Sequence, residues 1–251
     1  MLEYALYFTI TFLVSGLFGV VGLGSSLLLI PIFTFLGLDF NLAKAMGLFI
    51  NGITTLSLTL QNIKSKILSG REIVPLFVIG VVFASIGAFG SNYISESFVK
   101  ALFILFILLS LFFLFLGHID SNSSLKSGNS RSLYFFIAFI AFVGGLIGVG
   151  GGAVYLPLFI YLGIKTKQSI AMASALIPVV SFSAFFTYST FIVIDWVLLC
   201  VVAFGALVGA FFAHKIMKNI EKEIYLRVMI SLLLVAIAIY MVYREILGEA
   251  V

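Results

Sequence analysis

Residues 145–159 read GLIGVGGGAVYLPLF, a stretch in which glycines interrupt a sequence that is otherwise apolar enough to cross a membrane. The glycines in this cluster are Gly148, Gly150, Gly151 and Gly152. Each glycine weakens a helix by about 1 kcal/mol relative to alanine. The cluster therefore predicts a broken membrane helix, and the break requires a reason.

The composition of the chain indicates an integral membrane protein. Of its 251 residues, 63% are hydrophobic and 10% are charged, whereas a soluble domain carries about 25% charged residues. The net charge of +4 comes from basic residues in short loops, which favours contact with anionic lipid over binding of nucleic acid. The single cysteine, Cys200, excludes an internal disulfide and a cysteine-rich metal site, and we expect no cofactor.

Stretches without Asp, Glu, Lys or Arg mark the predicted membrane spans. They are 4–38, 45–63, 73–95, 101–119, 132–164, 168–194, 196–214 and 228–243. A helix needs about 20 apolar residues to cross the hydrocarbon core. The stretches 4–38 and 132–164 are too long for one straight crossing, and each contains a glycine cluster near its middle. We therefore expect an all-α membrane protein with about eight transmembrane helices. The first stretch lacks the basic segment and cleavage site of a signal peptide, so we interpret it as a retained span.

The pattern of the first half restarts after a polar linker, residues 118–131. The segments that correspond are GLFGVVG at 16–22 with GLIGVGG at 145–151, LLLIPIFTFLG at 27–37 with AVYLPLFIYLG at 153–163, and NLAKAMG at 41–47 with KQSIAMA at 167–173. This indicates two four-span repeats, 1–117 and 132–251, each with its first helix broken at a glycine cluster. With an even number of spans the halves share one orientation, unless a broken segment changes the parity.

Paired breaks at equivalent positions predict a transport site. Irregular backbone at membrane depth persists only where protein buries it or water reaches it. The half-helix that follows a break turns its positive N-terminal end towards the break, which suits an anion. The lining residues are Gly22, Gly24, Ser25 and Ser26 in the first half and Gly150, Gly151 and Gly152 in the second. The alternative is that the glycines only allow close helix packing.

Proline placement refines this interpretation of the half-helices. Pro157 is expected near the first turn of its half-helix, where a missing N–H costs little, whereas Pro31 is expected further along its own and would kink it. Ser25 and Ser26 would cap the first half-helix or donate their hydroxyl groups to a ligand.

The two glycine runs, the AMG and AMA segments and the four-plus-four layout together resemble the sulfite exporter TauE/SafE family of membrane transporters. The resemblance covers nearly the whole chain, and the most specific part is GxGGGxxxxP in the second half. The first half departs from it, with GLGSS in place of the triple glycine. The resemblance implies transport of sulfite, sulfonates or related small anions across the cytoplasmic membrane of a bacterium.

The span after each break carries neutral hydrogen-bonding side chains at helical spacing. Asn51 and Thr55 lie in the first half, and Ser174 and Ser181 lie in the second. They would complete an anion site without adding a buried charge, or would only bond neighbouring helices to one another. No charged residue stands near the middle of a predicted span. We interpret Lys44 as an interfacial charge at a span edge that, with Lys165, draws anions inward.

We therefore expect an alternating-access carrier for a small sulfur-containing anion, with lipid and the anion as partners. A passive anion channel is the main alternative. A membrane enzyme is less favoured because no catalytic motif is present, and a membrane assembly protein is also less favoured. The sequence leaves open the identity of the anion, the direction of transport and the coupling ion. It also leaves open the side of the N-terminus and whether copies form a homo-oligomer.

Overall fold

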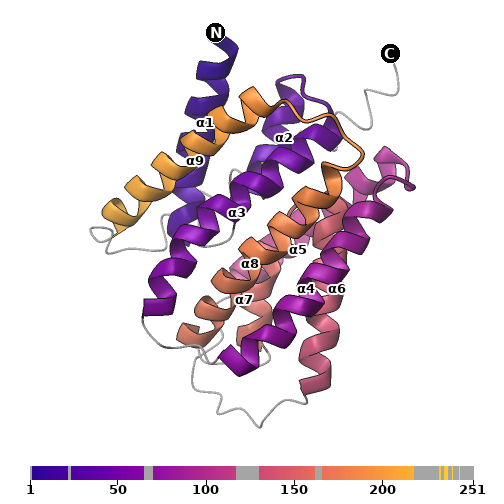
Figure 1. The fold of residues 1–251 in the computed structure, drawn as a ribbon, viewed down its shortest axis with the longest axis vertical. Helices are drawn as coiled ribbons and strands as arrows, with labels where there is room; N and C mark the ends of the chain where they lie inside the picture. The colour runs from indigo at the N-terminus through magenta and orange to yellow at the C-terminus, as the bar shows by residue number, and fades with distance from the viewer. Residues whose placement is uncertain are drawn as a thin grey trace.

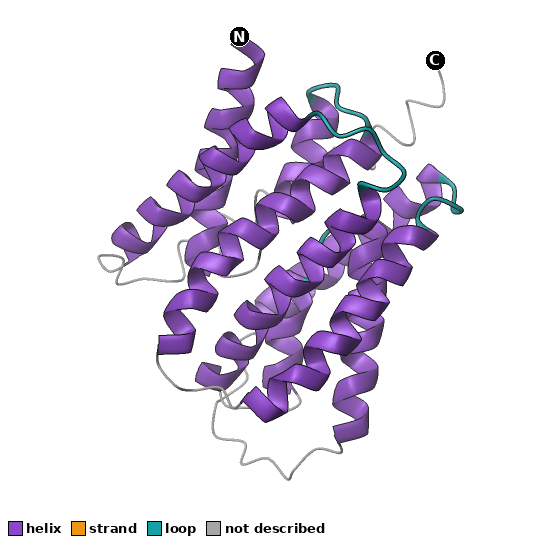
Figure 2. Cartoon of the chain, in the orientation of Figure 1, coloured by secondary structure: helices purple, strands orange, loops and turns teal. Residues whose placement is uncertain are grey.

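A computed structural model describes residues 2–21, 24–64, 70–116, 130–161 and 166–217, together with isolated positions between 232 and 243. In this part of the chain every regular element is a helix (Figure 2). The helices are α1 (Leu2–Val21), α2 (Ser26–Phe35), α3 (Phe40–Lys64), α4 (Gly70–Gly90), α5 (Glu96–Leu116), α6 (Ser130–Ile147), α7 (Gly152–Tyr161), α8 (Thr166–Tyr188) and α9 (Trp196–Met217). The all-α fold predicted from the sequence is confirmed for these residues.

The described helices fall into two length classes. Helices α2 and α7 have 10 residues each, or about 15 Å, which is half the thickness of a bilayer core. The others have between 18 and 25 residues, and two of them, α4 and α8, contain a window that is both long and apolar enough to cross it. The two short helices are the second parts of the two overlong stretches, each of which is interrupted at its glycine cluster.

At each interruption the chain reverses direction instead of continuing across the membrane. The reversal uses left-handed backbone, with φ of 87° at Gly24, 84° at Gly148 and 70° at Gly150, conformations that glycine adopts without strain. Helix α2 therefore runs back along α1, and the ring of Tyr7 near the start of α1 lies 5.3 Å from the ring of Phe33 near the end of α2. Each short helix is thus a half-helix that returns to the side from which the preceding helix came.

Both half-helices carry a proline at their sixth residue, which revises one expectation. Helix α2 begins at Ser26 and contains Pro31, and α7 begins at Gly152 and contains Pro157. Pro157 therefore lies beyond the first turn, because α7 begins at Gly152, one residue before the segment 153–163 that was expected to form it.

The longer helices pack in two kinds of pair. Helices α3 and α8 are antiparallel and central, with Phe49 of α3 beside Phe185 of α8. Helices α1 and α9 run parallel, since the ring of Phe8 lies beside that of Phe204 and the ring of Phe12 beside that of Phe212. Helices α4 and α6 form the corresponding pair on the other side of the molecule (Figure 1).

Burial separates the central helices from the peripheral ones. The apolar window Ala171–Tyr188 of α8 is 72% buried inside the protein, whereas the window Ile73–Gly90 of α4 is 28% buried. Both windows are long and apolar enough to cross a membrane. Large apolar side chains such as Phe112 of α5 and Phe211 of α9 are exposed, as expected of surfaces that face lipid. The half-helices and α3 and α8 are therefore held in the protein interior.

Candidate functional site

The two breaks meet in the interior of the protein, although they are far apart in the sequence. Ser26, the first residue of α2, donates a hydrogen bond from its Oγ to the carbonyl oxygen of Val149, at 2.9 Å. Val149 lies in the turn between α6 and α7, three residues before α7 begins. This contact brings the N-terminal end of α2 next to the turn from which α7 starts. Each helix N-terminus carries a partial positive charge of about half a unit.

Asn51 of α3 lies between the two breaks and contacts both. Its Nδ2 donates to the Val149 carbonyl at 3.2 Å and to Oγ of Ser181 in α8 at 3.0 Å. A carbonyl oxygen only accepts, so Nδ2 must face Val149, and Oδ1 is left facing the first break. At Gly24 an added Cβ would overlap this Oδ1, which shows how closely the backbone of the first break approaches the amide.

At the second break, replacing a glycine with any larger residue would displace the neighbouring side chains. At Gly150 an added Cβ would overlap Oγ of Ser181 and lie 3.1 Å from Asn51 Nδ2. At Gly151, where φ is 76°, an added Cβ would lie 2.7 Å from the ring of Tyr155. Both the left-handed backbone and the close side chains therefore require glycine here.

Other glycines make the close helix contacts that were the alternative explanation for the cluster. An added Cβ at Gly209 of α9 would overlap the carbonyl of Phe12 in α1, and one at Gly145 of α6 would overlap the carbonyl of Ala84 in α4. These are backbone contacts between membrane helices of the small-residue type. Packing and chain reversal are thus carried by different glycines, which the sequence pattern alone does not separate.

Two buried polar atoms at the breaks have no hydrogen-bond partner among the described residues. They are Oγ of Ser25 and Oδ1 of Asn51, and both residues are fully buried. The Ser25 hydroxyl does not cap α2, because the N–H groups of Leu28 and Leu29 bond instead to its backbone carbonyl. An unsatisfied buried polar atom costs about 1–3 kcal/mol, so this position favours a bound ligand or water.

Thr55 and Ser174 flank the centre without pointing their hydroxyl groups into it. Thr55 Oγ1 donates to the carbonyl of Asn51 at 2.6 Å, and Ser174 Oγ donates to the carbonyl of Ala171 at 3.0 Å. The hydroxyl of Thr59 in turn donates to the carbonyl of Ser174 and so connects α3 to α8. Of the residues predicted for the site, Gly24, Ser25, Ser26, Asn51, Gly150 and Ser181 come together, and Gly151 and Gly152 lead into α7. Gly22 lies outside the described residues.

Lys44 is buried within the protein, whereas its position at the edge of a predicted span favoured an exposed charge. Its exposed fraction is 1%, and its Nζ donates to Oγ of Ser91 at 2.6 Å. Gly148 makes this burial possible, because an added Cβ there would lie 2.5 Å from Cβ of Lys44. The sequence contains one signal of this placement, which is the spacing of the two residues. Lys44 precedes Asn51 by seven residues and therefore shares its face of α3.

Within the described residues, no group of three or more acidic, histidine or cysteine side chains lies close enough together to hold a metal ion. The chemistry of the central site therefore rests on neutral hydrogen-bonding groups, helix ends and the nearby ammonium of Lys44.

Comparison with known proteins gives two matches. The model of the family described as sulfite exporter TauE/SafE matches residues 7–241. A protein of Methanocaldococcus jannaschii named as a probable membrane transporter is 25% identical over 186 residues, which cover 71% of this chain and 70% of that protein. No solved structure matches the chain significantly.

Proposed function

Because this chain belongs to the sulfite exporter TauE/SafE family and is a multi-pass membrane transporter, we propose that it carries a small sulfur-containing anion by alternating access. The substrate class is sulfite or an organosulfonate, and the membrane is the cytoplasmic membrane of a bacterium. The observation that supports this most strongly is the meeting of the two breaks at Asn51, where buried polar atoms lack protein partners.

The proposed architecture is a pair of inverted repeats, α1 to α5 and α6 to the C-terminal end. In the described part, the packing of α1 on α9 corresponds to that of α6 on α4, and the contacts of α2 with α3 correspond to those of α7 with α8. A glycine supports each of the two outer pairs, Gly209 in one and Gly145 in the other. The antiparallel pair α3 and α8 then lies at the pseudo-two-fold axis, which is the arrangement of many secondary transporters.

Inversion follows from the half-helices. In the first repeat, α1 and the returning half-helix α2 together do not cross the membrane. The three remaining long helices, α3, α4 and α5, then give an odd number of crossings, so the second repeat starts on the opposite side. The half-helices consequently run in opposite directions and begin near the same depth. Their positive ends face the centre from opposite sides, a geometry that suits an anion held midway between the two membrane faces.

The site offers a substrate hydrogen-bond donors and one side-chain oxygen that can only accept. The donors are N–H groups at the helix ends and the Ser25 hydroxyl, which can also accept, and the oxygen that only accepts is Oδ1 of Asn51. A fully deprotonated dianion has no hydrogen for this acceptor. A protonated sulfur oxyanion, or a sulfonate that carries an amine, satisfies both kinds of group, and we expect such anions to bind in preference to sulfate.

In the proposed mechanism, the two repeats rock about the axis between α3 and α8 and expose the site to each side in turn. Ser26 and Asn51 both bond to Val149, so one hydrogen-bonded junction connects the two breaks and the central helix. A substrate bound at this junction contacts both repeats together, which allows its binding energy to favour one arrangement over the other.

Uptake into proteoliposomes tests the proposal. Sulfite, sulfate, thiosulfate, sulfoacetate and taurine are each measured with the wild-type chain, Gly151→Leu and a control, Gly37→Leu. Gly37 also has a positive φ, of 95°, but an added Cβ meets nothing within 4 Å. The control therefore reproduces the backbone strain without filling the break.

Saturable uptake of one sulfur anion, with counterflow, is expected for the wild type and the control and lost in folded Gly151→Leu. Uptake that rises linearly with concentration and shows no counterflow would identify a passive channel instead. Normal transport by folded Gly151→Leu would place the substrate elsewhere, and no movement of any of the five anions would contradict the substrate class.

A further inference from the structure

Lys44 is a buried ammonium on α3 that forms no ion pair with any of the described residues. Its Nζ lies 2.6 Å from Oγ of Ser91 and 5.0 Å from the ring centres of Phe40 and Tyr188. All three partners are neutral. Ionisable side chains at such positions are costly and mark functional sites in membrane proteins.

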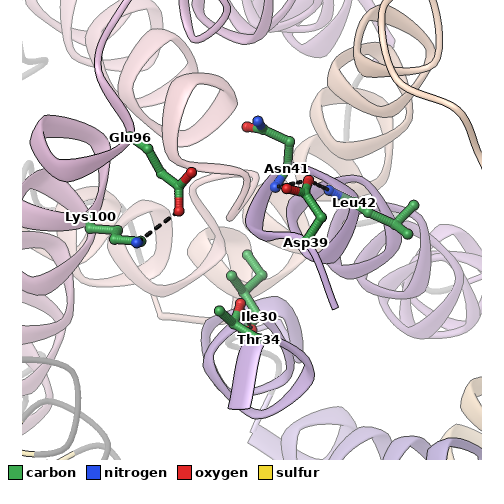
Figure 3. A network of polar contacts seen from close by, with 7 residues as sticks. All are labelled: Ile30, Thr34, Asp39, Asn41, Leu42, Glu96 and Lys100. Atoms are coloured by element: carbon green, nitrogen blue, oxygen red, sulfur yellow. Dashed lines mark hydrogen bonds and ion pairs between the residues drawn. The ribbon is translucent and has the colours of Figure 1, made fainter. Parts of the chain in front are cut away.

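The two carboxylates nearest to this cluster are engaged elsewhere and lie at the protein surface. Asp39 accepts hydrogen bonds from the backbone N–H groups of Asn41 and Leu42, at 2.9 and 3.1 Å, and so caps α3 (Figure 3). Glu96 forms an ion pair with Lys100 at 2.7 Å (Figure 3). Among the described residues, no carboxylate lies within ion-pair distance of Lys44.

Helix ends near Lys44 do not replace a counter-ion either. The carbonyl groups of Gly145 and Leu146, at the C-terminal end of α6, accept hydrogen bonds from the hydroxyl of Tyr188, at 3.1 and 2.8 Å. Tyr188 thus satisfies these carbonyls itself and turns only its ring face to the ammonium. Lys44 also lies in the second turn of α3, near the positive end of its own helix, where a cation is disfavoured.

Lys44 is placed between one membrane face and the central break. Its aliphatic stem lies on the turn at Gly148, where an added Cβ would be 2.6 Å from its Cγ. Asn51 follows two turns further along the same face of α3, about 10 Å away by helix geometry. The side chain of Lys44 therefore lies between the Asp39 end of α3 and Asn51.

We propose that Lys44 forms a second anion subsite, in which its ammonium pairs with the negatively charged oxygens of the sulfite or sulfonate on the way to the break. This inference rests on the proposed function. In the empty protein, Ser91 and the two rings hold the ammonium. The arriving anion takes the place of the Ser91 hydroxyl, exchanging a neutral acceptor for a charged one. The bond to Ser91 has one ionised partner, whereas the bond to the anion has two, which adds the attraction between opposite charges in a poorly solvated interior.

The subsite belongs to one side of the membrane only. In the segments NLAKAMG and KQSIAMA, the position of Lys44 in the first repeat corresponds to Ile170 in the second. An inverted copy of the route, leading to the opposite face, therefore lacks the ammonium. The anion is expected to bind more tightly when the site is open to the Asp39 side.

The test measures KM and maximal rate for uptake of labelled sulfite in oriented proteoliposomes, with melting temperatures of all variants. Lys44→Met keeps the stem against Gly148 and removes the charge, and Lys44→Arg restores it. Lys100→Met is the matched control, because its ammonium lies 5.6 Å from the same Phe40 ring but is paired at the surface. We expect KM to rise about ten- to a hundredfold in Lys44→Met, to recover partly in Lys44→Arg and to change less than twofold in Lys100→Met.

A second variant is expected to change KM in the opposite direction, and this test does not depend on the folding of Lys44→Met. Ser91→Ala removes the resting partner of the ammonium but leaves the charge, so KM should fall. A wild-type KM in folded Lys44→Met, or a raised KM in Ser91→Ala, would overturn the subsite. If the wild type transports none of the sulfur anions, the proposed function fails instead, and the two failures are thereby distinguished.

Discussion

The two breaks reach the same half-helix geometry by different chemistry. Both are followed by a ten-residue helix with a proline at its sixth position. The first break, GLGSS, has one described left-handed glycine and two serines, whereas the second, GVGGG, has left-handed glycines at Gly148, Gly150 and Gly151. The first supplies hydroxyl groups, and the second supplies space. The half-helix geometry therefore recurs, but the proposed substrate site is built asymmetrically.

Asymmetry also separates the central helices. Asn51 and Lys44 of α3 correspond, through the AMG and AMA segments, to Ile177 and Ile170 of α8. The first repeat thus contributes the amide and the ammonium, and the glycines of the second repeat make room for both. One half thus provides polar groups and the other provides space for them. We therefore expect mutations in the two halves to have very different effects.

The largest effect is expected from filling the second break. Gly150→Ala forces a Cβ into Oγ of Ser181 and places an alanine at φ of 70°. We expect uptake of the transported anion to fall at least a hundredfold. Gly37→Ala is the control, since it has the same kind of strained φ but open space, and should retain uptake within about twofold, with about 1 kcal/mol of strain. Equal losses in both would show that backbone strain alone is responsible.

The next largest effect on uptake distinguishes Asn51, at the centre of the proposed site, from Thr55, one turn further along α3. Asn51→Leu preserves volume but leaves the Val149 carbonyl and Ser181 with fewer partners, and it removes the one acceptor at the breaks. Uptake should fall about ten- to a hundredfold, and the free energy of unfolding by about 1–3 kcal/mol. Thr55→Val is the matched control, because its hydroxyl bonds only to carbonyls of its own helix. A larger loss in Thr55→Val than in Asn51→Leu would move the site one turn along α3.

Local sequence was sufficient for the helices and for the position of the breaks, because apolar length and glycine clusters are local properties. It also placed Asn51 and Ser181 beside the breaks, since a helical period fixes which residues share a face. It could not give the direction in which the chain leaves each break. That direction depends on the left-handed φ values at Gly24 and Gly150, and a glycine allows either sign.

The burial of Lys44 could not be predicted from the sequence, for a different reason. A lysine that is the fifth residue of a helix is usually at the interface, where its ammonium reaches water. Here the ends of α4, α6 and α8 cover it, and Gly148 leaves the space for its stem. Such coverage depends on contacts between segments far apart in the chain. The same is true of the glycines, because Gly145 and Gly148 differ in role but not in local sequence.

A smaller effect is expected from the unpartnered hydroxyl of the first break. Ser25→Ala removes an Oγ that has no partner in the protein, so the folded state loses no hydrogen bond and the melting temperature should stay the same or rise. If this hydroxyl contacts the substrate, KM should increase about three- to tenfold. An unchanged KM together with a raised melting temperature would show that Ser25 is a buried defect and does not bind the anion.

The smallest effect on transport is expected from the adjacent serine, which has the opposite role. Ser26 Oγ bonds to the Val149 carbonyl, and this carbonyl also accepts from Asn51. Ser26→Ala should therefore lower the free energy of unfolding by about 1 kcal/mol and leave KM within twofold, because Asn51 still satisfies the carbonyl. Chemical denaturation and uptake assays on the two serine variants measure both quantities. If Ser26→Ala raises KM while Ser25→Ala does not, the substrate contacts the second serine, and the first break donates from within its helix instead of from the turn before it.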